Sequence, residues 1–234
     1  MIVIGLTGSI GMGKSTVARM ARRLCVPVYD SDATVHRLYA QGGAAVRPVG
    51  AAFAGVVRDG AIDRAALSRH VVGDPAAFRR LERIVHPLVR RAQTEWLRRA
   101  MRRRAPVVVL DVPLLFETAG DVLCDLVVVV SAPAFIQRAR VMARPGMTAA
   151  KLAEILARQM ADAEKRRRAD YVLDTGRPRG ETLRGLMAII RAARRRTGTH
   201  WPMNPRRLGK AIDARNRPRY GDHRTRSRRR PPRR

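Results

Sequence analysis

The chain alternates short, continuously apolar runs with longer segments whose apolar residues recur at helical spacing. Continuous runs predict buried strands, because a parallel sheet covered by helices on both faces has no polar side. The runs lie at 2–6, 26–29, 106–110, 125–130 and 171–173, and helical patterns lie at 16–24, 33–41, 134–144, 148–167 and 178–195. This alternation predicts a doubly wound α/β domain with five strands.

The segment between the second and third strands is longer than a crossover needs, and its pattern is almost entirely helical. Asp74-Pro75 predicts a helix start, and Pro87 predicts a kink or break inside the long pattern that follows. We therefore expect residues of about 33–104 to form a helical insertion that covers a substrate.

The first strand leads into Gly8-Ser-Ile-Gly-Met-Gly-Lys-Ser15 and then into a helix. The spacing G-x-x-x-x-G-K-[ST] in this context predicts a phosphate loop, in which backbone N–H groups and the helix N-terminus hold phosphates. Lys14 is expected to reach the β- and γ-phosphates, and Ser15 to hold Mg²⁺. A glycine-rich turn that merely joins strand to helix is the alternative. The predicted ATP-binding residues are Gly8, Gly11, Met12, Gly13, Lys14, Ser15 and Thr16.

Three acids follow predicted strands at the sheet edge where the phosphate loop lies. Asp32 is the candidate base for an acceptor hydroxyl, and Asp111 the candidate acid for the water shell of the metal. Asp30 is a candidate substrate contact. Helix capping or a surface position is the alternative for each of these acids.

Further candidates lie on loops and helices near this edge. Leu114 and Glu117 belong to an apolar loop after the third strand, which indicates a pocket wall or simply buried packing. Arg140 and Arg144 share a helix face that leads into a Pro-Gly loop, so they are candidates to cover the transferred phosphate, or part of a solvated face. His86 is a candidate substrate contact or a structural histidine.

The formal charge is +29, and much of the excess lies beyond Arg191, where only Asp213 and Asp222 oppose the basic residues. Residues 197–234 are rich in Arg, Pro and Gly, which predicts a basic, disordered tail, with a nucleic-acid tether as the alternative. Cys25 and Cys124 predict buried free thiols and a cytoplasmic protein. The chain has no run of about 20 apolar residues that could cross a membrane.

Together these motifs resemble the dephospho-CoA kinase family. The resemblance covers about residues 1–195, and the phosphate loop alone would not carry it, because many kinases share that loop. Its segments are 5–16, Val28-Tyr-Asp-Ser-Asp32, His86-Pro-Leu88, Val112-Pro-Leu-Leu-Phe-Glu117, the Q-x-x-R-x-x-x-R pattern of 137–144, Gln159 and Ala169-Asp-Tyr-Val-Leu-Asp174.

The resemblance implies a three-layer α/β/α phosphate-loop kinase fold with strand order 2-3-1-4-5, a helical CoA-binding part and a lid at about 140–165. It implies that ATP and Mg²⁺ phosphorylate the ribose 3′-hydroxyl of dephospho-CoA, with Asp32 as base and Arg140 and Arg144 as lid arginines. Thr175 stands where the family commonly has asparagine. The expected kinase domain is 1–196, in a monomer or weak oligomer.

Three rival hypotheses have distinct signatures. A different acceptor on the same fold predicts turnover of a nucleotide or sugar instead of dephospho-CoA. A GTPase switch predicts N-K-x-D and D-x-x-G motifs, and neither string occurs in the sequence. A nucleic-acid-binding protein predicts binding that weakens steeply with salt and is lost when the tail is removed.

Overall fold

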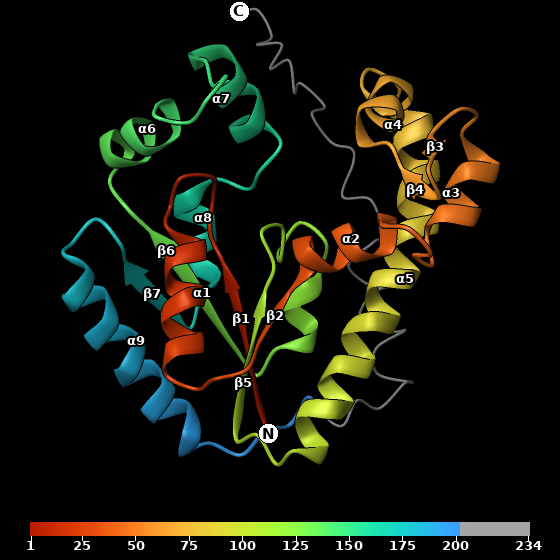
Figure 1. Cartoon of the computed structure of the whole chain (residues 1–234). Coiled ribbons are helices and arrows are strands. Elements are labelled where there is room, and N and C mark those ends of the chain that lie inside the picture. Colours follow the sequence, from red (N-terminus) through yellow and green to blue (C-terminus); the bar gives the residue numbers. More distant parts are fainter. Residues whose placement is uncertain (202–234) are drawn as a thin grey trace, which may run out of the picture.

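The computed structural model describes residues 1–201, and its centre is a five-stranded parallel sheet (Figure 1). The strands lie in the order β2-β5-β1-β6-β7, which confirms the predicted order once the strands of the main sheet are counted along the chain. Their bounds are β1 Ile2–Thr7, β2 Val28–Asp30, β5 Val107–Asp111, β6 Leu126–Ser131 and β7 Tyr171–Asp174.

Helices cover both faces of this sheet, which confirms the three layers. Helices α1 (Lys14–Arg23) and α9 (Arg179–Arg194) pack on the face that carries Ile4 and Val109. The carboxyl-terminal half of α5 (Pro75–Arg102) packs on the opposite face, through Leu97 and Ala100. Successive strand residues therefore point into two different cores, as the continuous apolar runs require.

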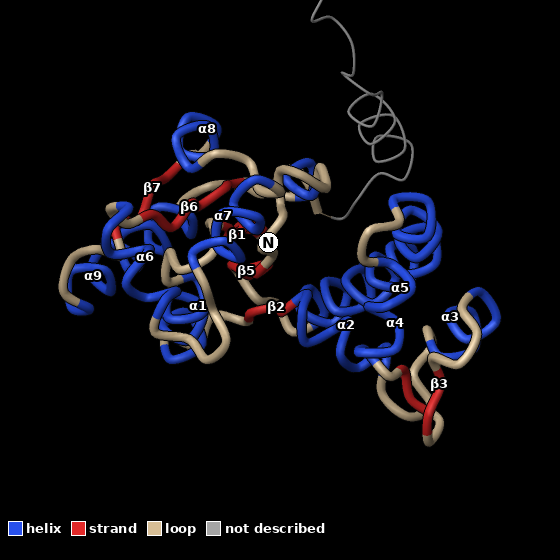
Figure 2. Tube along the Cα trace, turned by 90° about the horizontal axis from the view of Figure 1, so that it is seen from above, coloured by secondary structure: helices blue, strands red, loops and turns tan. Residues whose placement is uncertain are grey.

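The insertion contains α2 (Ser31–Tyr39), α3 (Val46–Ala52), α4 (Arg64–Val71) and the amino-terminal half of α5 (Figure 2). It has its own apolar cluster. The prediction of an almost wholly helical segment was wrong at one point, because β3 (Val57–Arg58) and β4 (Ala61–Ile62) form a hairpin. Asp59 and Gly60 supply the two positive φ angles of its turn, a signal present in the sequence.

Two further local predictions need correction. Helix α5 continues through Pro87 without a break, because apolar residues on both sides of the proline, among them Val85 and Leu88, pack in the insertion core. The helix predicted over 148–167 is two helices, α7 (Ala149–Ala157) and α8 (Asp162–Arg168), after α6 (Ala134–Met142). A short 3₁₀ helix, η1, spans Gly120–Leu123.

The predicted boundary of the tail was placed too early. The segment 197–201 is largely exposed but anchored: Trp201 is 7% exposed, and the backbone N–H groups of Thr199 and His200 donate to Asp125 Oδ1 at 2.7 and 3.0 Å. The rest of the predicted tail lies outside the described residues. Cys124 is buried as predicted, whereas Cys25 is exposed in the turn after α1. Within residues 1–201, the helices are all too short or too polar to cross a membrane.

Candidate active site

The phosphate loop between β1 and α1 is shaped by its glycines. Gly11 and Gly13 have φ angles of 78° and 82°, which residues with a side chain rarely adopt. A Cβ on Gly8 would lie 2.4 Å from Val130 Cγ2, so only glycine fits against β6 there. Gly13 caps α1 without a side chain, so the first N–H groups of the helix stay available to an anion.

A cleft of about 500 Å³ lies over this loop. It brings together most of the residues predicted for phosphate transfer, although they come from distant parts of the chain. Its lining includes the whole segment 8–17, Asp32 from α2, Arg140 and Arg144 from the end of α6, Gln159, and Thr175 after β7.

Lys14 and Asp111 form an ion pair on the floor of the site. The Lys14 Nζ lies 2.5 Å from Asp111 Oδ1, and both side chains are largely shielded from solvent. Burial raises the pKa of Asp111 above its ordinary value, and the nearby Lys14 ammonium opposes that rise. The end of β5 thus holds the carboxylate predicted to serve the metal next to the lysine predicted to bind phosphate.

The two acids after β2 have different surroundings. Asp30 caps α2, since its Oδ1 accepts from the Ala33 N–H at 2.9 Å, and its Oδ2 lies 3.5 Å from an Arg22 guanidinium nitrogen. Asp30 lines neither the phosphate-loop cleft nor the adjoining cleft described below, so its predicted substrate contact gains no support. Asp32 is exposed and lines both clefts.

The segment that carries α6 and α7 is tied to the phosphate loop at its tip. The Ile10 N–H donates to Gln159 Oε1 at 3.1 Å, and the Ile10 carbonyl accepts from Gln137 Nε2 at 2.8 Å. Neither glutamine had a predicted role, because a contact with a loop more than a hundred residues away leaves no local signal. The one indication of a role in the sequence was that both glutamines lie in segments that resemble the dephospho-CoA kinase family.

Thr175 and Arg140 make a second connection to the loop. The Thr175 hydroxyl donates to the Met12 carbonyl at 2.8 Å, and Arg140 donates to the Thr175 carbonyl at 2.6 Å. Thr175 therefore supports the loop backbone directly. Arg144 lies just beyond the end of α6, and its side chain lines the cleft without a hydrogen bond or ion pair to any residue of 1–201.

A second cleft, of about 380 Å³, adjoins the first and is largely apolar. It lies between α2, α5 and the loop after β5, and Asp32 and Pro113 line both clefts. Leu114 and His86, both predicted to contact the substrate, line this second cleft.

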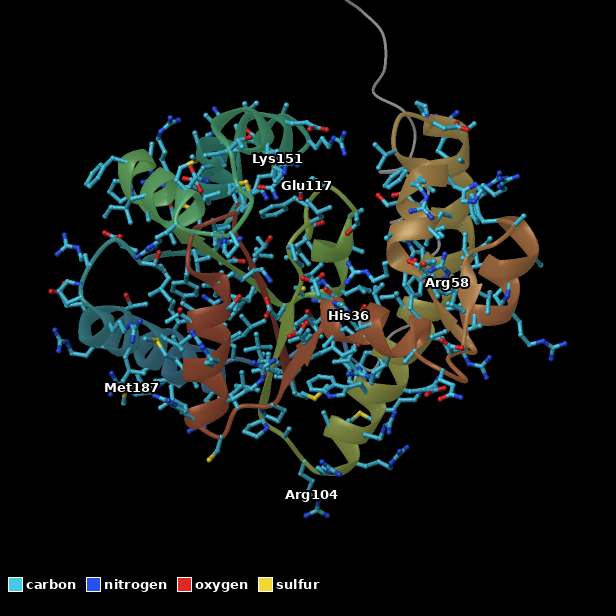
Figure 3. All side chains as sticks on the ribbon, turned by 45° about the horizontal axis from the view of Figure 1, so that its top comes forward. His36, Arg58, Arg104, Glu117, Lys151 and Met187 are labelled. Atoms are coloured by element: carbon cyan, nitrogen blue, oxygen red, sulfur yellow. The ribbon has the colours of Figure 1, made fainter. Side chains whose placement is uncertain are left out.

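Glu117 lies on the side of the sheet toward α7 (Figure 3). Its Oε1 is 2.9 Å from Nζ of the fully buried Lys165 and accepts from the Met160 N–H at 2.8 Å. Its carboxylate therefore joins the loop after β5 to the start of α8, a role that the sequence did not indicate.

Comparison with known proteins agrees with this geometry. The family model for dephospho-CoA kinase matches residues 2–178. A dephospho-CoA kinase of Paramagnetospirillum magneticum is 65% identical over 166 residues, which cover 71% of this chain and 78% of that protein. A dephospho-CoA kinase of Rhodospirillum rubrum is 57% identical over 195 residues, covering 82% and 92%.

Solved structures lead to the same fold. The crystal structure of TT1252 from Thermus thermophilus is 38% identical with a TM-score of 0.73, and the match covers 82% of this chain and 96% of that one. A dephospho-CoA kinase from Campylobacter jejuni, 22% identical with a TM-score of 0.62, covers 81% and 95% and shows the shared fold alone. The family match over most of the described residues is decisive: this chain belongs to the dephospho-CoA kinase family.

Proposed function

We propose that this protein transfers the γ-phosphoryl group of ATP to the ribose 3′-hydroxyl of dephospho-CoA, giving coenzyme A and ADP. The family supports ATP and dephospho-CoA as the substrates. The proposed roles of the residues rest on one observation. Asp32 lies where the phosphate-loop cleft and the apolar cleft meet. A carboxylate there faces the donor phosphate on one side and an acceptor hydroxyl on the other.

In this mechanism Asp32 orients the hydroxyl and accepts its proton as the new O–P bond forms. The N–H groups of the phosphate loop and Lys14 hold the β- and γ-phosphates, so that Lys14 exchanges its Asp111 partner for phosphate oxygens. Arg140 and Arg144 lie on the opposite wall and stabilise charge on the transferred group. Closure of the proposed lid, residues of about 140–165, would exclude water.

The residues present fit Mg²⁺. Ser15 lines the phosphate-loop cleft and Asp111 lies against Lys14 at its floor, so both offer hard oxygen ligands beside the expected phosphates. Mg²⁺ is commonly held by one or two protein oxygens together with phosphate oxygens and water. The bound ion would neutralise phosphate charge, and the chain would contribute the Ser15 hydroxyl and the Asp111 carboxylate to its environment.

The direct test is to incubate the purified full-length protein with ATP, Mg²⁺ and dephospho-CoA, and to follow coenzyme A by mass and ADP by a coupled assay. Equal amounts of the two products are expected. ADP release without coenzyme A, or turnover of another nucleotide or a sugar in its place, would refute the assignment. We also propose a cytoplasmic monomer or weak oligomer, without a specific nucleic-acid partner.

A further inference from the structure

A row of three arginines and one histidine lines the insertion on the side that faces the sheet. Arg79, Arg83, His86 and Arg90 follow one another along α5 at spacings of four, three and four, which places them on a single helix face. All four line a cleft of about 850 Å³ whose opposite wall includes Glu117. The row is therefore more than a solvated helix face, because it forms one wall of a cavity.

Three guanidinium groups line this cleft, and their side chains make no hydrogen bond or ion pair with any residue in the part of the chain that the structure describes. Arg79 lies near the Asp74 carboxylate, which leaves Arg83 and Arg90 as the two without a nearby acid partner. The two acids of the cleft are already engaged. Glu82 Oε1 lies 3.7 Å from His86 Nε2, and Glu117 is bound by the buried Lys165. The cleft therefore favours an anion.

This basic cleft is continuous with the apolar cleft that ends at Asp32. Glu82, His86, Arg90 and Thr118 line both. A molecule that places a hydroxyl at Asp32 and extends along α5 therefore passes His86 and Arg90. Dephospho-CoA has two negatively charged phosphates next to its reacting ribose. With the ribose hydroxyl at Asp32, these phosphates would lie in the part of the cleft lined by His86 and Arg90.

We propose that Arg83 and Arg90, assisted by His86, bind the 5′-diphosphate of dephospho-CoA, an inference that rests on the proposed function. Guanidinium groups suit this task, because their planar donors bind phosphate oxygens in pairs. The apolar walls around Val85 and Leu114 are left for the uncharged parts of the substrate. Binding at these arginines fixes the distance between the diphosphate and Asp32, and so presents the 3′-hydroxyl.

The test variants are Arg83→Gln, Arg90→Gln and the double variant that carries both changes. The control is Arg98→Gln. Arg98 lies on the same helix, is exposed and lines none of the clefts described above, so the control removes the same charge elsewhere. Each single variant should raise KM for dephospho-CoA roughly tenfold, and the double variant more, because each removes a charge-assisted bond. KM for ATP and the Tm should stay within error. A double variant whose KM for dephospho-CoA changes less than about twofold would overturn the proposal.

A truncated acceptor separates recognition of the diphosphate from general damage. Adenosine has the ribose hydroxyl but no diphosphate, and it is measured as acceptor, or as inhibitor at saturating ATP where its turnover is slow. The variants should treat adenosine as the wild type does. Equal losses with adenosine and dephospho-CoA would contradict a diphosphate site. Failure of the proposed function would show differently, as absence of coenzyme A from the wild-type reaction.

Discussion

Lys14 Nζ lies 2.5 Å from Asp111 Oδ1, so the cation proposed to bind phosphate is paired with the acid at the end of the neighbouring strand. The pair keeps a buried carboxylate neutralised and holds the lysine at the floor of the cleft. In the proposed mechanism, phosphates that enter the loop compete with Asp111 for Lys14, and the released carboxylate is then free to contribute to the environment of a metal ion.

Replacing Lys14 with alanine should lower kcat by roughly 10²–10³-fold, the effect of losing one preorganised charge at a transferring phosphate. Arg23→Ala is the matched control, since it removes an exposed cation from the last turn of the same helix. Steady-state kinetics with ATP and dephospho-CoA measure both. Near-normal turnover of the Lys14 variant would argue against the assignment of the phosphate loop.

Asp32→Asn should keep ATP affinity and lose about 10²–10⁴-fold in kcat, the contribution typical of a general base. The side chain is exposed, so folding should be unaffected. Asp59→Asn, in the exposed hairpin turn, is the control, because asparagine also tolerates its positive φ. If the Asp32 variant turned over at the normal rate, the base would have to be another group.

Glu117→Gln should destabilise the protein by about 3–5 kcal/mol, because it leaves the fully buried Lys165 without a counter-charge. Adding Lys165→Met should recover most of that loss. Glu154→Gln breaks an exposed pair with Arg158 on α7 and should change the free energy of unfolding by less than about 1 kcal/mol. Denaturant titrations compare the three. Equal stabilities of the Glu117 and Glu154 single variants would mean that the buried pair has no special role.

A chain ending at Trp201 should match the full-length protein in kcat and KM within a factor of a few, whereas one ending at Arg196 should lose stability. The second cut removes Trp201 from the core, and loss of such a side chain alone costs about 3–5 kcal/mol. Thermal unfolding and kinetics of both truncations provide the comparison. A large kinetic defect in the longer one would show that residues after Trp201 take part in catalysis or assembly.

Asp125 should make stability depend on pH. Burial by itself raises the pKa of Asp125, but the N–H donors of Val3, Thr199 and His200 outweigh it and hold the pKa below its ordinary value. A lowered pKa stabilises the fold above the ordinary aspartate pKa of about 3.9, and that stability is lost as pH falls through the folded-state value.

The measurement is the free energy of unfolding of wild type and Asp125→Asn between about pH 6 and pH 3. The wild-type advantage should be largest near pH 6 and shrink toward pH 3. A difference independent of pH would exclude Asp125 ionisation as the cause.

The strands of the sheet and the phosphate loop could be predicted because their signals are local. Continuous apolar runs identify buried strands, and a fixed glycine–lysine spacing identifies the loop. The uninterrupted α5 could not be predicted, since packing around Pro87 overrides the local penalty. The roles of Asp30 and Asp32 separate only in three dimensions, where one caps a helix and the other faces both clefts.

Ile10 has both of its peptide groups engaged by glutamines from the α6–α8 segment. A nucleotide that took the Ile10 N–H would have to displace Gln159. Occupancy of the loop and the position of this segment would then be thermodynamically linked, and the link would be reciprocal. The contact between Ile10 and Gln159 would make the position of the proposed lid depend on whether a donor nucleotide is bound.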